Sequence, residues 1–232
     1  MLNADQLRKY PLFSGLSDDE LAKLAPCLTK RQYAKGAYLF HPGSPVLNMY
    51  VVESGLVRAF FTNSHGEEFM LDLIGPRSAV GLPLMREDQT RMLGASAVTP
   101  LVSLVMAQQD LIRFSQRSPQ LMRNVSDLVH GSMEKLLIHI RSLVTLGVNG
   151  RLAGVFLYLS RSDGDLNVKT EIDLPLSQTD LANWIGASRG HLNRAISHLE
   201  ESGLICVQEH KLVILDRPGL ERASEELLSE TM

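Results

Sequence analysis

The first half of the chain alternates short apolar, β-prone runs with turns that contain glycine. Between about Tyr33 and Arg113, glycines punctuate these runs, in turn dipeptides such as Pro42-Gly43. The clearest runs cover residues 37–40, 48–55, 56–61, 68–74 and 99–107. Many short strands at regular spacing predict a small antiparallel barrel or roll.

After Pro119 the spacing of apolar residues changes to three or four, which predicts one long helix. A helix of about 27 residues is about 40 Å long at 1.5 Å per residue. Its apolar stripe consists of Met122, Val125, Val129, Met133, Leu136, Ile140 and Leu143. Such a stripe extends beyond what a small roll can cover, so we expect a second copy of the helix to pack against it as a parallel two-fold dimer seam. The alternative, a helix that packs along its own domain, stays open.

In the last third of the chain, a capping box at Ser177 and Asp180 predicts the start of another helix. The residues that we expect on its buried face are Leu181, Ala182 and Ile185. Gly186 ends this helix, and Ala187 and Ser188 leave room for only a short turn before a second helix. This spacing is typical of a helix-turn-helix.

The second helix is predicted to run from Ser188 to about Ser202, with Gly203 at its C-terminus. Its outward face carries residue types that contact DNA, because Arg can bind guanine and Asn can bind adenine through paired hydrogen bonds. Residues 204–215 then predict a two-stranded hairpin, the wing, which turns at residues 209–211. The residues that we expect to contact DNA are Ser177, Gln178, Thr179, Ser188, Arg189, Gly190, His191, Asn193, Arg194 and Ser197.

These patterns predict an α+β fold in three parts. The expected parts are a β-roll domain at residues 1–117, a dimerisation helix at 118–146 and a winged helix-turn-helix domain at 147–232. Gly147 and the pair Asn149-Gly150 are expected to interrupt the long helix and offer a hinge. A short helix is predicted to follow at residues 151–161.

Two further short helices are predicted near the ends of the chain. A capping box at Ser17 and Glu20 predicts a helix to about Cys27, ahead of the roll. The acidic tail, residues 220–232, is expected to form a short helix beside the wing. Contact with RNA polymerase through this tail is an option that no sequence feature supports.

The composition is that of an ordinary globular protein, with 232 residues of which 44% are hydrophobic and 21% charged. No run approaches the roughly 18 apolar residues of a membrane span, and the N-terminus lacks the segments of a secretion signal. We therefore expect a cytoplasmic protein without membrane contact. The net charge of −3 does not indicate a nucleic-acid partner, so the DNA-binding prediction depends on the local pattern.

The sequence offers no catalytic or metal-binding constellation. Its two cysteines, Cys27 and Cys206, cannot supply the four ligands of a typical iron–sulfur cluster. Its seven histidines show no ligand spacing with a carboxylate, so the pattern does not favour haem or another metal site. An enzyme of the cupin type would need a close histidine pair on adjacent strands, whereas the roll has His41 and His65, both in turns. We therefore expect no enzymatic activity.

Over essentially its full length the chain resembles the CRP/FNR family, the superfamily of the cyclic AMP receptor protein and the fumarate-nitrate regulator. The most specific similarity lies in VNGRLA at 148–153 and GASRGHLNRAISHLEESGLI at 186–205. It implies a cyclic-nucleotide-binding-like jelly roll and a C-terminal winged helix-turn-helix. That family's recognition helix typically carries Ser-Arg-Glu and a further Arg, which here correspond to Ser188, Arg189, Gly190 and Arg194. Since glycine cannot accept a hydrogen bond from cytosine, the resemblance implies an operator that departs from the family's common half-site.

The resemblance also implies an effector pocket, for which cyclic-nucleotide binders have a segment that begins Gly-Glu and ends Arg-Ser or Arg-Thr. The matching positions of that segment are Gly81, Leu82, Arg91 and Met92. Aligned from the hinge, Leu136 and Leu137 match long-helix positions that are polar next to adenine in cyclic AMP binders. Leu82 and Met92 replace polar residues, and each buried polar group of a nucleotide left unpaired costs about 1–3 kcal/mol. We therefore expect no binding of cyclic AMP at micromolar concentration. We expect the pocket to be apolar, and either to hold an apolar or otherwise different effector or to be packed shut.

Together these patterns predict a transcription regulator that binds double-stranded DNA as a homodimer, at a pseudo-palindromic operator that spaces its recognition helices about 34 Å apart. An effector or a change of redox state is expected to shift the hinge at residues 146–149, and the sequence does not identify that effector. The alternative is a ligand-binding regulatory module that acts through a protein partner without DNA.

Overall fold

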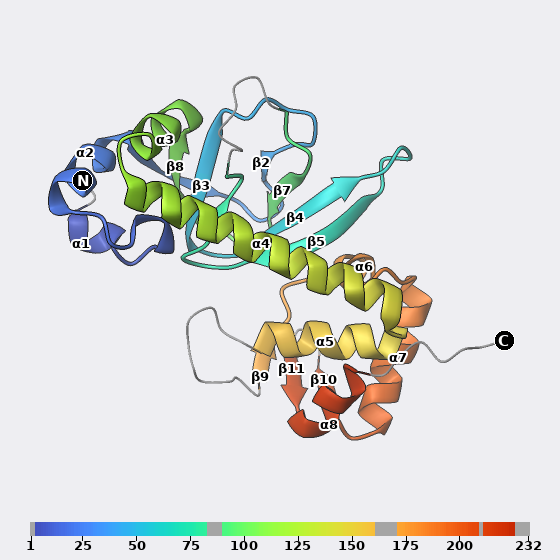
Figure 1. Ribbon diagram of the computed structural model, residues 1–232. Coiled ribbons are helices and arrows are strands. Elements are labelled where there is room, and N and C mark those ends of the chain that lie inside the picture. Colours follow the sequence, from blue (N-terminus) through green and yellow to red (C-terminus); the bar gives the residue numbers. More distant parts are fainter. Residues whose placement is uncertain (1–2, 83–89, 161–170, 209–210, 226–232) are drawn as a thin grey trace. The chain divides into compact units, whose positions relative to one another are not determined.

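The computed structural model describes residues 3–82, 90–160, 171–208 and 211–225 (Figure 1). The chain forms two compact units, Met1–Lys135 and Leu136–Met232. The division falls inside the long helix α4 (Pro119–Thr145), so each unit contains part of that helix. The three functional parts expected at residues 1–117, 118–146 and 147–232 remain a prediction.

The first unit contains the predicted antiparallel roll. Two four-stranded sheets form it, with the strand orders β1-β8-β3-β6 and β2-β7-β4-β5. The strands are β1 (Leu28–Tyr33), β2 (Tyr38–Phe40), β3 (Asn48–Ser54), β4 (Val57–Thr62), β5 (Glu68–Ile74), β6 (Ala79–Val80), β7 (Gly94–Ala97) and β8 (Leu101–Ala107). The five apolar runs of the sequence correspond to β2, β3, β4, β5 and β8.

The sequence pattern did not predict three of these strands. β1 is exposed at four of its six positions, so it has no apolar alternation. β6 is only two residues long. β7 consists of the small residues Gly-Ala-Ser-Ala, all of them buried, and the ring of Phe60 lies directly against Gly94. Close packing of small residues against their neighbours, rather than intrinsic strand propensity, therefore places β7 in the sheet.

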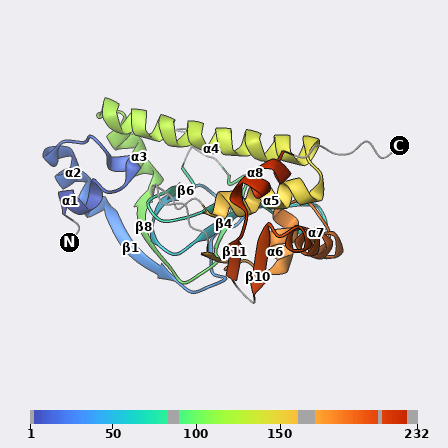
Figure 2. The same ribbon diagram turned by 90° about the horizontal axis from the view of Figure 1, so that it is seen from below.

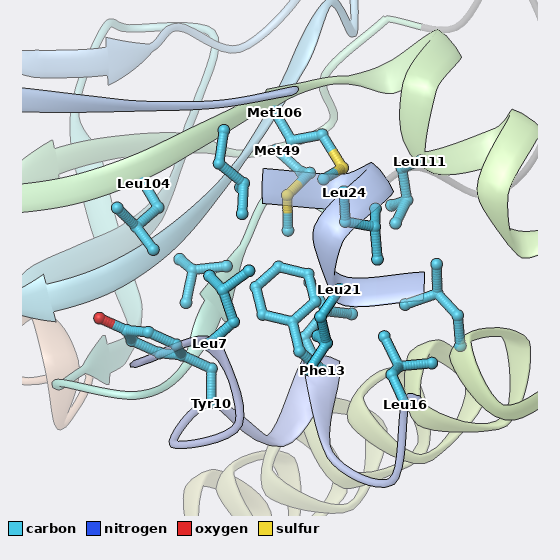
Figure 3. Close-up of a cluster of buried hydrophobic side chains, with 14 of the residues drawn as sticks. Leu7, Tyr10, Phe13, Leu16, Leu21, Leu24, Met49, Leu104, Met106 and Leu111 are labelled. Atoms are coloured by element: carbon cyan, nitrogen blue, oxygen red, sulfur yellow. The ribbon is translucent and has the colours of Figure 1, made fainter. Parts of the chain in front are cut away.

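Short helices cover one side of the roll and bury a cluster of apolar side chains (Figure 3). They are α1 (Ala4–Leu7), η1 (Pro11–Phe13), α2 (Asp18–Leu24), η2 (Ala25–Cys27) and α3 (Gln108–Ser115). The predicted capping box is confirmed, since Ser17 Oγ accepts a hydrogen bond from the Glu20 amide at 3.3 Å and Glu20 Oε2 accepts one from the Ser17 amide at 2.8 Å. Phe13 and Leu21 are fully buried in the cluster.

The first turns of α4 belong to the same core. Leu121 is 0% and Val125 4% exposed. Asn124 Nδ2 donates hydrogen bonds to the carbonyl oxygens of Leu12 at 2.9 Å and Ser14 at 2.7 Å. These contacts fix the beginning of α4 to the first unit.

The second unit combines helices with a small sheet (Figure 2). Its elements beyond α4 are α5 (Val148–Ser160), β9 (Glu171–Asp173), α6 (Gln178–Trp184), α7 (Arg189–Glu201), β10 (Ile205–Gln208), β11 (Lys211–Ile214) and α8 (Arg217–Ala223). α5 packs against α7 and α8, and α6 packs against α7. The predicted hairpin is confirmed as β10 and β11, although the turn residues 209 and 210 lie outside the described part of the chain.

Three expectations for this unit need correction. The wing sheet has a third strand, β9, which pairs with β11. α5 begins at Val148, so Asn149 and Gly150 lie inside it and the break after α4 is confined to Leu146 and Gly147. α8 begins before the predicted tail helix and packs on α5, while residues 226–232 lie outside the described range.

Within the described part of the chain, no helix is long and apolar enough to cross a membrane.

Candidate nucleic-acid interface and roll interior

α6 begins at the predicted capping box. Ser177 Oγ accepts a hydrogen bond from the Asp180 amide at 3.1 Å, and Asp180 Oδ2 accepts one from Ser177 Oγ at 2.6 Å. Gly186, whose φ is +60°, allows the chain to leave the helix sharply. The buried residues at this helix are Leu181, Ala182, Trp184 and Ile185. This burial leaves Gln178 and Thr179 exposed.

α7 is capped by Ser188, whose Oγ accepts a hydrogen bond from the His191 amide at 3.3 Å. The same oxygen lies 2.8 Å from His191 Nδ1, so the imidazole ring is tied to the cap. The residues of α7 that are buried are Leu192, Ala195 and Leu199. Because these lie three or four residues apart, the remaining positions form one outward face.

The structure exposes every residue that the sequence assigned to DNA contact. These are Ser177, Gln178, Thr179, Ser188, Arg189, Gly190, His191, Asn193, Arg194 and Ser197. Within the described residues, no hydrogen bond or ion pair engages the side chains of Arg189 and Asn193, so their donors are available to a ligand. Arg194 Nε donates only a long hydrogen bond, 3.4 Å, to the Gly190 carbonyl.

One contact holds the wing against α7, and another joins two strands of the wing sheet. Glu200 Oε1 accepts a hydrogen bond from the Val207 amide at 2.8 Å, so this acidic residue of α7 is used to dock β10. Lys211 of β11 forms an ion pair with Glu171 of β9, and the hydrogen bond raises the pKa of Lys211. Glu200, near the C-terminal end of α7, is thus used in a contact within the fold. Arg189 and Arg194 lie in the N-terminal half of the same helix.

In the roll, the structure brings Gly81 and Arg91 together. Arg91 is 8% exposed, its Nη1 donates to the Gly81 carbonyl at 2.8 Å, and its Nη2 donates to the Asn48 carbonyl. The guanidinium lies 4.1 Å from the centroid of the Phe40 ring. Burial lowers the pKa of Arg91, and its Nε has no hydrogen-bond partner among the described residues.

In the first unit, Leu82 and Met92 do not join this cluster. Leu82 is partly buried and packs against the core of the first unit, and Met92 is 85% exposed. Leu136 and Leu137 belong to the second unit and are 40% and 61% exposed. Residues 83–89, which complete the matched segment, lie outside the described residues.

α4 presents an exposed apolar stripe that contains four of the seven residues of the predicted seam. Met122, Met133, Leu136 and Ile140 are exposed as expected, but Val125 is buried in the chain's own core. Val129 packs partly against that core, and Leu143 is half-buried. The exposed apolar residues that the pattern missed are Leu137, Ile138 and Val144.

The end of α4 contacts the helix-turn-helix within the second unit. A Cβ added to Gly186 would lie 2.9 Å from Leu143 Cδ2, so the leucine packs on the turn between α6 and α7. Burial and the nearby charge of Arg151 lower the pKa of His139. Arg151 Nε is itself buried without a hydrogen-bond partner in the described residues. Sequence periodicity could not identify these contacts, because they join separate helices.

Comparisons with known proteins agree over most of the chain. It is 28% identical over 215 residues to the anaerobic regulatory protein of Bacillus subtilis, covering 89% of this chain and 88% of that protein. It is 27% identical over 200 residues to the cyclic AMP receptor protein of Thermus thermophilus, which covers 86% of this chain and 89% of that protein. The solved structure of FixK2 from Bradyrhizobium japonicum has the same fold, with a TM-score of 0.76, 21% identity and coverage of 84% and 96%.

Two domain families match the two parts of the fold. Residues 30–118 match the cyclic nucleotide-binding domain, and residues 150–223 match the Crp-like helix-turn-helix domain. A roll of this kind joined to a helix-turn-helix defines a transcription regulator rather than an enzyme. The chain belongs to the CRP/FNR family.

Proposed function

We propose that the protein acts in the cytoplasm as a homodimer on double-stranded DNA, with α7 of each copy in the major groove of one half-site. The exposed face of α7 carries this proposal, because Arg189 and Asn193 have free donors there. These residue types read guanine and adenine through paired hydrogen bonds. Two-fold symmetry would place the helices about 34 Å apart, which fits a pseudo-palindromic operator.

The exposed stripe on α4 supports the homodimer. Its members are Met122, Met133, Leu136, Leu137, Ile140 and Val144. From Met133 onward they recur at three- and four-residue intervals, so they lie on one face of the helix. A second copy presents the same stripe, and a two-fold contact covers both stripes at once.

We infer that the roll does not bind cyclic AMP at micromolar concentration. Arg91 is 8% exposed, and its guanidinium already donates hydrogen bonds to the carbonyl oxygens of Gly81 and Asn48, so two of its N–H groups are not available to a cyclic phosphate. Leu82, which is partly buried, offers no side-chain hydrogen bond to a ribose oxygen. A buried polar group that is left unpaired costs about 1–3 kcal/mol, which weakens nucleotide binding. The roll then accepts a different effector or none.

Titration calorimetry on the full-length protein tests this inference. We expect no saturable heat at micromolar cyclic AMP. Saturable binding in that range would contradict the inference while leaving DNA binding untouched.

The break at Leu146 and Gly147 is the proposed site of regulation. Leu143, just before it, contacts the turn between α6 and α7. A shift of α4 at the proposed seam would therefore be transmitted to the recognition helix through this contact. Solution scattering that gave one geometry for active and inactive forms would remove this coupling.

The decisive experiment selects duplexes from a random DNA library with purified full-length protein and then footprints them. We expect a pseudo-palindrome, with the Arg189→Ala and Arg194→Ala variants each binding it at least about tenfold more weakly. Arg222→Ala is the matched control, since Arg222 is an exposed arginine of α8 outside the proposed interface. Failure to enrich any duplex would favour the alternative, a regulatory module that acts through a protein partner.

A further inference from the structure

α7 contains a glycine that the fold does not require. Gly190 is exposed and is the second residue of the helix, and its φ is not positive. A Cβ added there would meet only Ser188 Oγ, at 3.9 Å, which is an ordinary van der Waals contact. Gly186 and Gly203 differ, because their φ values of +60° and +69° favour glycine. Position 190 could therefore hold alanine without strain.

Glycine at this position lowers the stability of the helix. It loses more backbone entropy on folding than alanine does, and it exposes more of the backbone to water. No contact among the described residues offsets this loss, since the space beside Gly190 is open. The compensation is therefore expected from what the outward face of α7 binds.

The surroundings of Gly190 define a notch in that face. Gly190, Asn193, Arg194 and Ser197 lie on one stripe, because residues three, four and seven apart are neighbours on a helix. Ser188 Oγ is engaged by His191, so the cap does not fill the open space. We call the bare backbone at Gly190 the notch. It lies at the N-terminal end of the stripe of polar side chains.

We propose that the notch receives the C5-methyl group of a thymine in each half-site. This inference rests on the proposed DNA binding by α7. Glycine has no side-chain donor or acceptor, so a purely polar base edge placed there would lose its hydrogen bonds to water. The thymine methyl is the apolar group of the major groove. It can contact the helix backbone itself only where no Cβ stands between the backbone and the base.

Two glycine-to-alanine variants separate this role from a structural one. Gly190→Ala is the test, and Gly154→Ala in α5 is the matched control, because a Cβ at either position meets open space or an ordinary contact. Both are expected to raise the melting temperature, since alanine is the better helix former. Only Gly190→Ala should weaken binding to the duplex that the wild-type protein selects, by about tenfold or more.

Replacing the selected thymine by uracil removes only the methyl group. We expect this to weaken wild-type binding about fivefold and to restore part of the affinity that Gly190→Ala loses, because the added Cβ then has no methyl group to meet. Equal binding by Gly190→Ala and wild type overturns the proposal, and so does a wild-type protein that is indifferent to uracil at every thymine of the half-site. Failure to select any duplex instead overturns the proposed DNA binding itself.

Discussion

At the scale of single residues, Arg91 shows how the roll holds a buried charge. No carboxylate faces it among the described residues, and backbone carbonyls of Gly81 and Asn48 accept its hydrogen bonds instead. The ring of Phe40 covers the guanidinium. Gly81 is required for this arrangement, because a Cβ there would lie 2.6 Å from Arg91 Nη1 and 2.9 Å from Phe40.

Gly81→Ala should therefore destabilise the protein by more than the strain of placing alanine at a positive φ, because the added Cβ also meets Arg91 and Phe40. Gly81 has φ +69° and Gly66 has φ +81°, but a Cβ at Gly66 meets nothing within 4 Å. We expect Gly81→Ala to lower the free energy of unfolding by about 3 kcal/mol and Gly66→Ala by about 1 kcal/mol. Urea titrations measure both, and equal losses would show that Arg91 and Phe40 simply move aside.

His139 gives a pH dependence of stability. Burial and Arg151 lower its pKa in the folded protein, so the unfolded chain takes up this proton more readily. Neutral His139 therefore makes its full contribution to the free energy of unfolding above pH 6.5, the ordinary pKa of histidine. This contribution is lost as the pH falls below that value. His139→Gln should reduce the fall in unfolding free energy between about pH 7.5 and about pH 5.5. An unchanged slope would contradict this assignment.

At the scale of elements, the apolar residues of α4 differ in burial along the helix. Leu121 and Val125 face the core of the first unit, whereas the stripe from Met133 to Val144 is exposed. An α-helix turns by about 100° per residue, so Ile138 lies well away from the stripe that contains Ile140. The two isoleucines are 60% and 47% exposed, which makes them a matched pair.

Ile140→Glu should dissociate the proposed dimer, because two carboxylates would be buried in one seam. We expect dimerisation to weaken by about 3 kcal/mol or more. Ile138→Glu introduces the same charge outside the stripe and should leave the dimer intact. Sedimentation equilibrium measures both, and a monomeric wild type or equal effects of the two variants would exclude this face as the seam.

At the scale of the whole molecule, the proposed two-fold dimer would set the geometry of the operator. A dimer with one α7 for each half-site requires the two sites to lie on the same side of the duplex, about one helical turn apart. Sequence recognition by each helix is then not sufficient for tight binding. The spacing between the half-sites matters as well.

Insertion of five base pairs between the selected half-sites rotates one of them by about half a turn. We expect affinity to fall at least about a hundredfold, since one helix loses its contacts. Replacing the same number of central base pairs without changing the spacing is the control. Full affinity after the insertion would rule out a rigid two-fold dimer on DNA.

The helix-turn-helix was predictable from sequence because its signals are local. Capping at Ser177 and Ser188 and the positive φ at Gly186 depend on residues within a few positions of one another. The exposed face of α7 follows from its own periodicity for the same reason. The five strands with apolar runs were predictable on similar grounds.

Tertiary structure decided the features that depend on distant residues. β7 lies in the sheet because its small residues fit beneath Phe60, and β9 joins the wing by pairing with β11. The heptad pattern assigned Val125 to the seam, but the core of the first unit buries it. Arg91 was matched from sequence as a possible ligand contact, and only the fold shows that backbone carbonyls of Gly81 and Asn48 accept two of its hydrogen bonds. Periodicity determines which residues share a face, but only packing against the rest of the chain determines what that face meets.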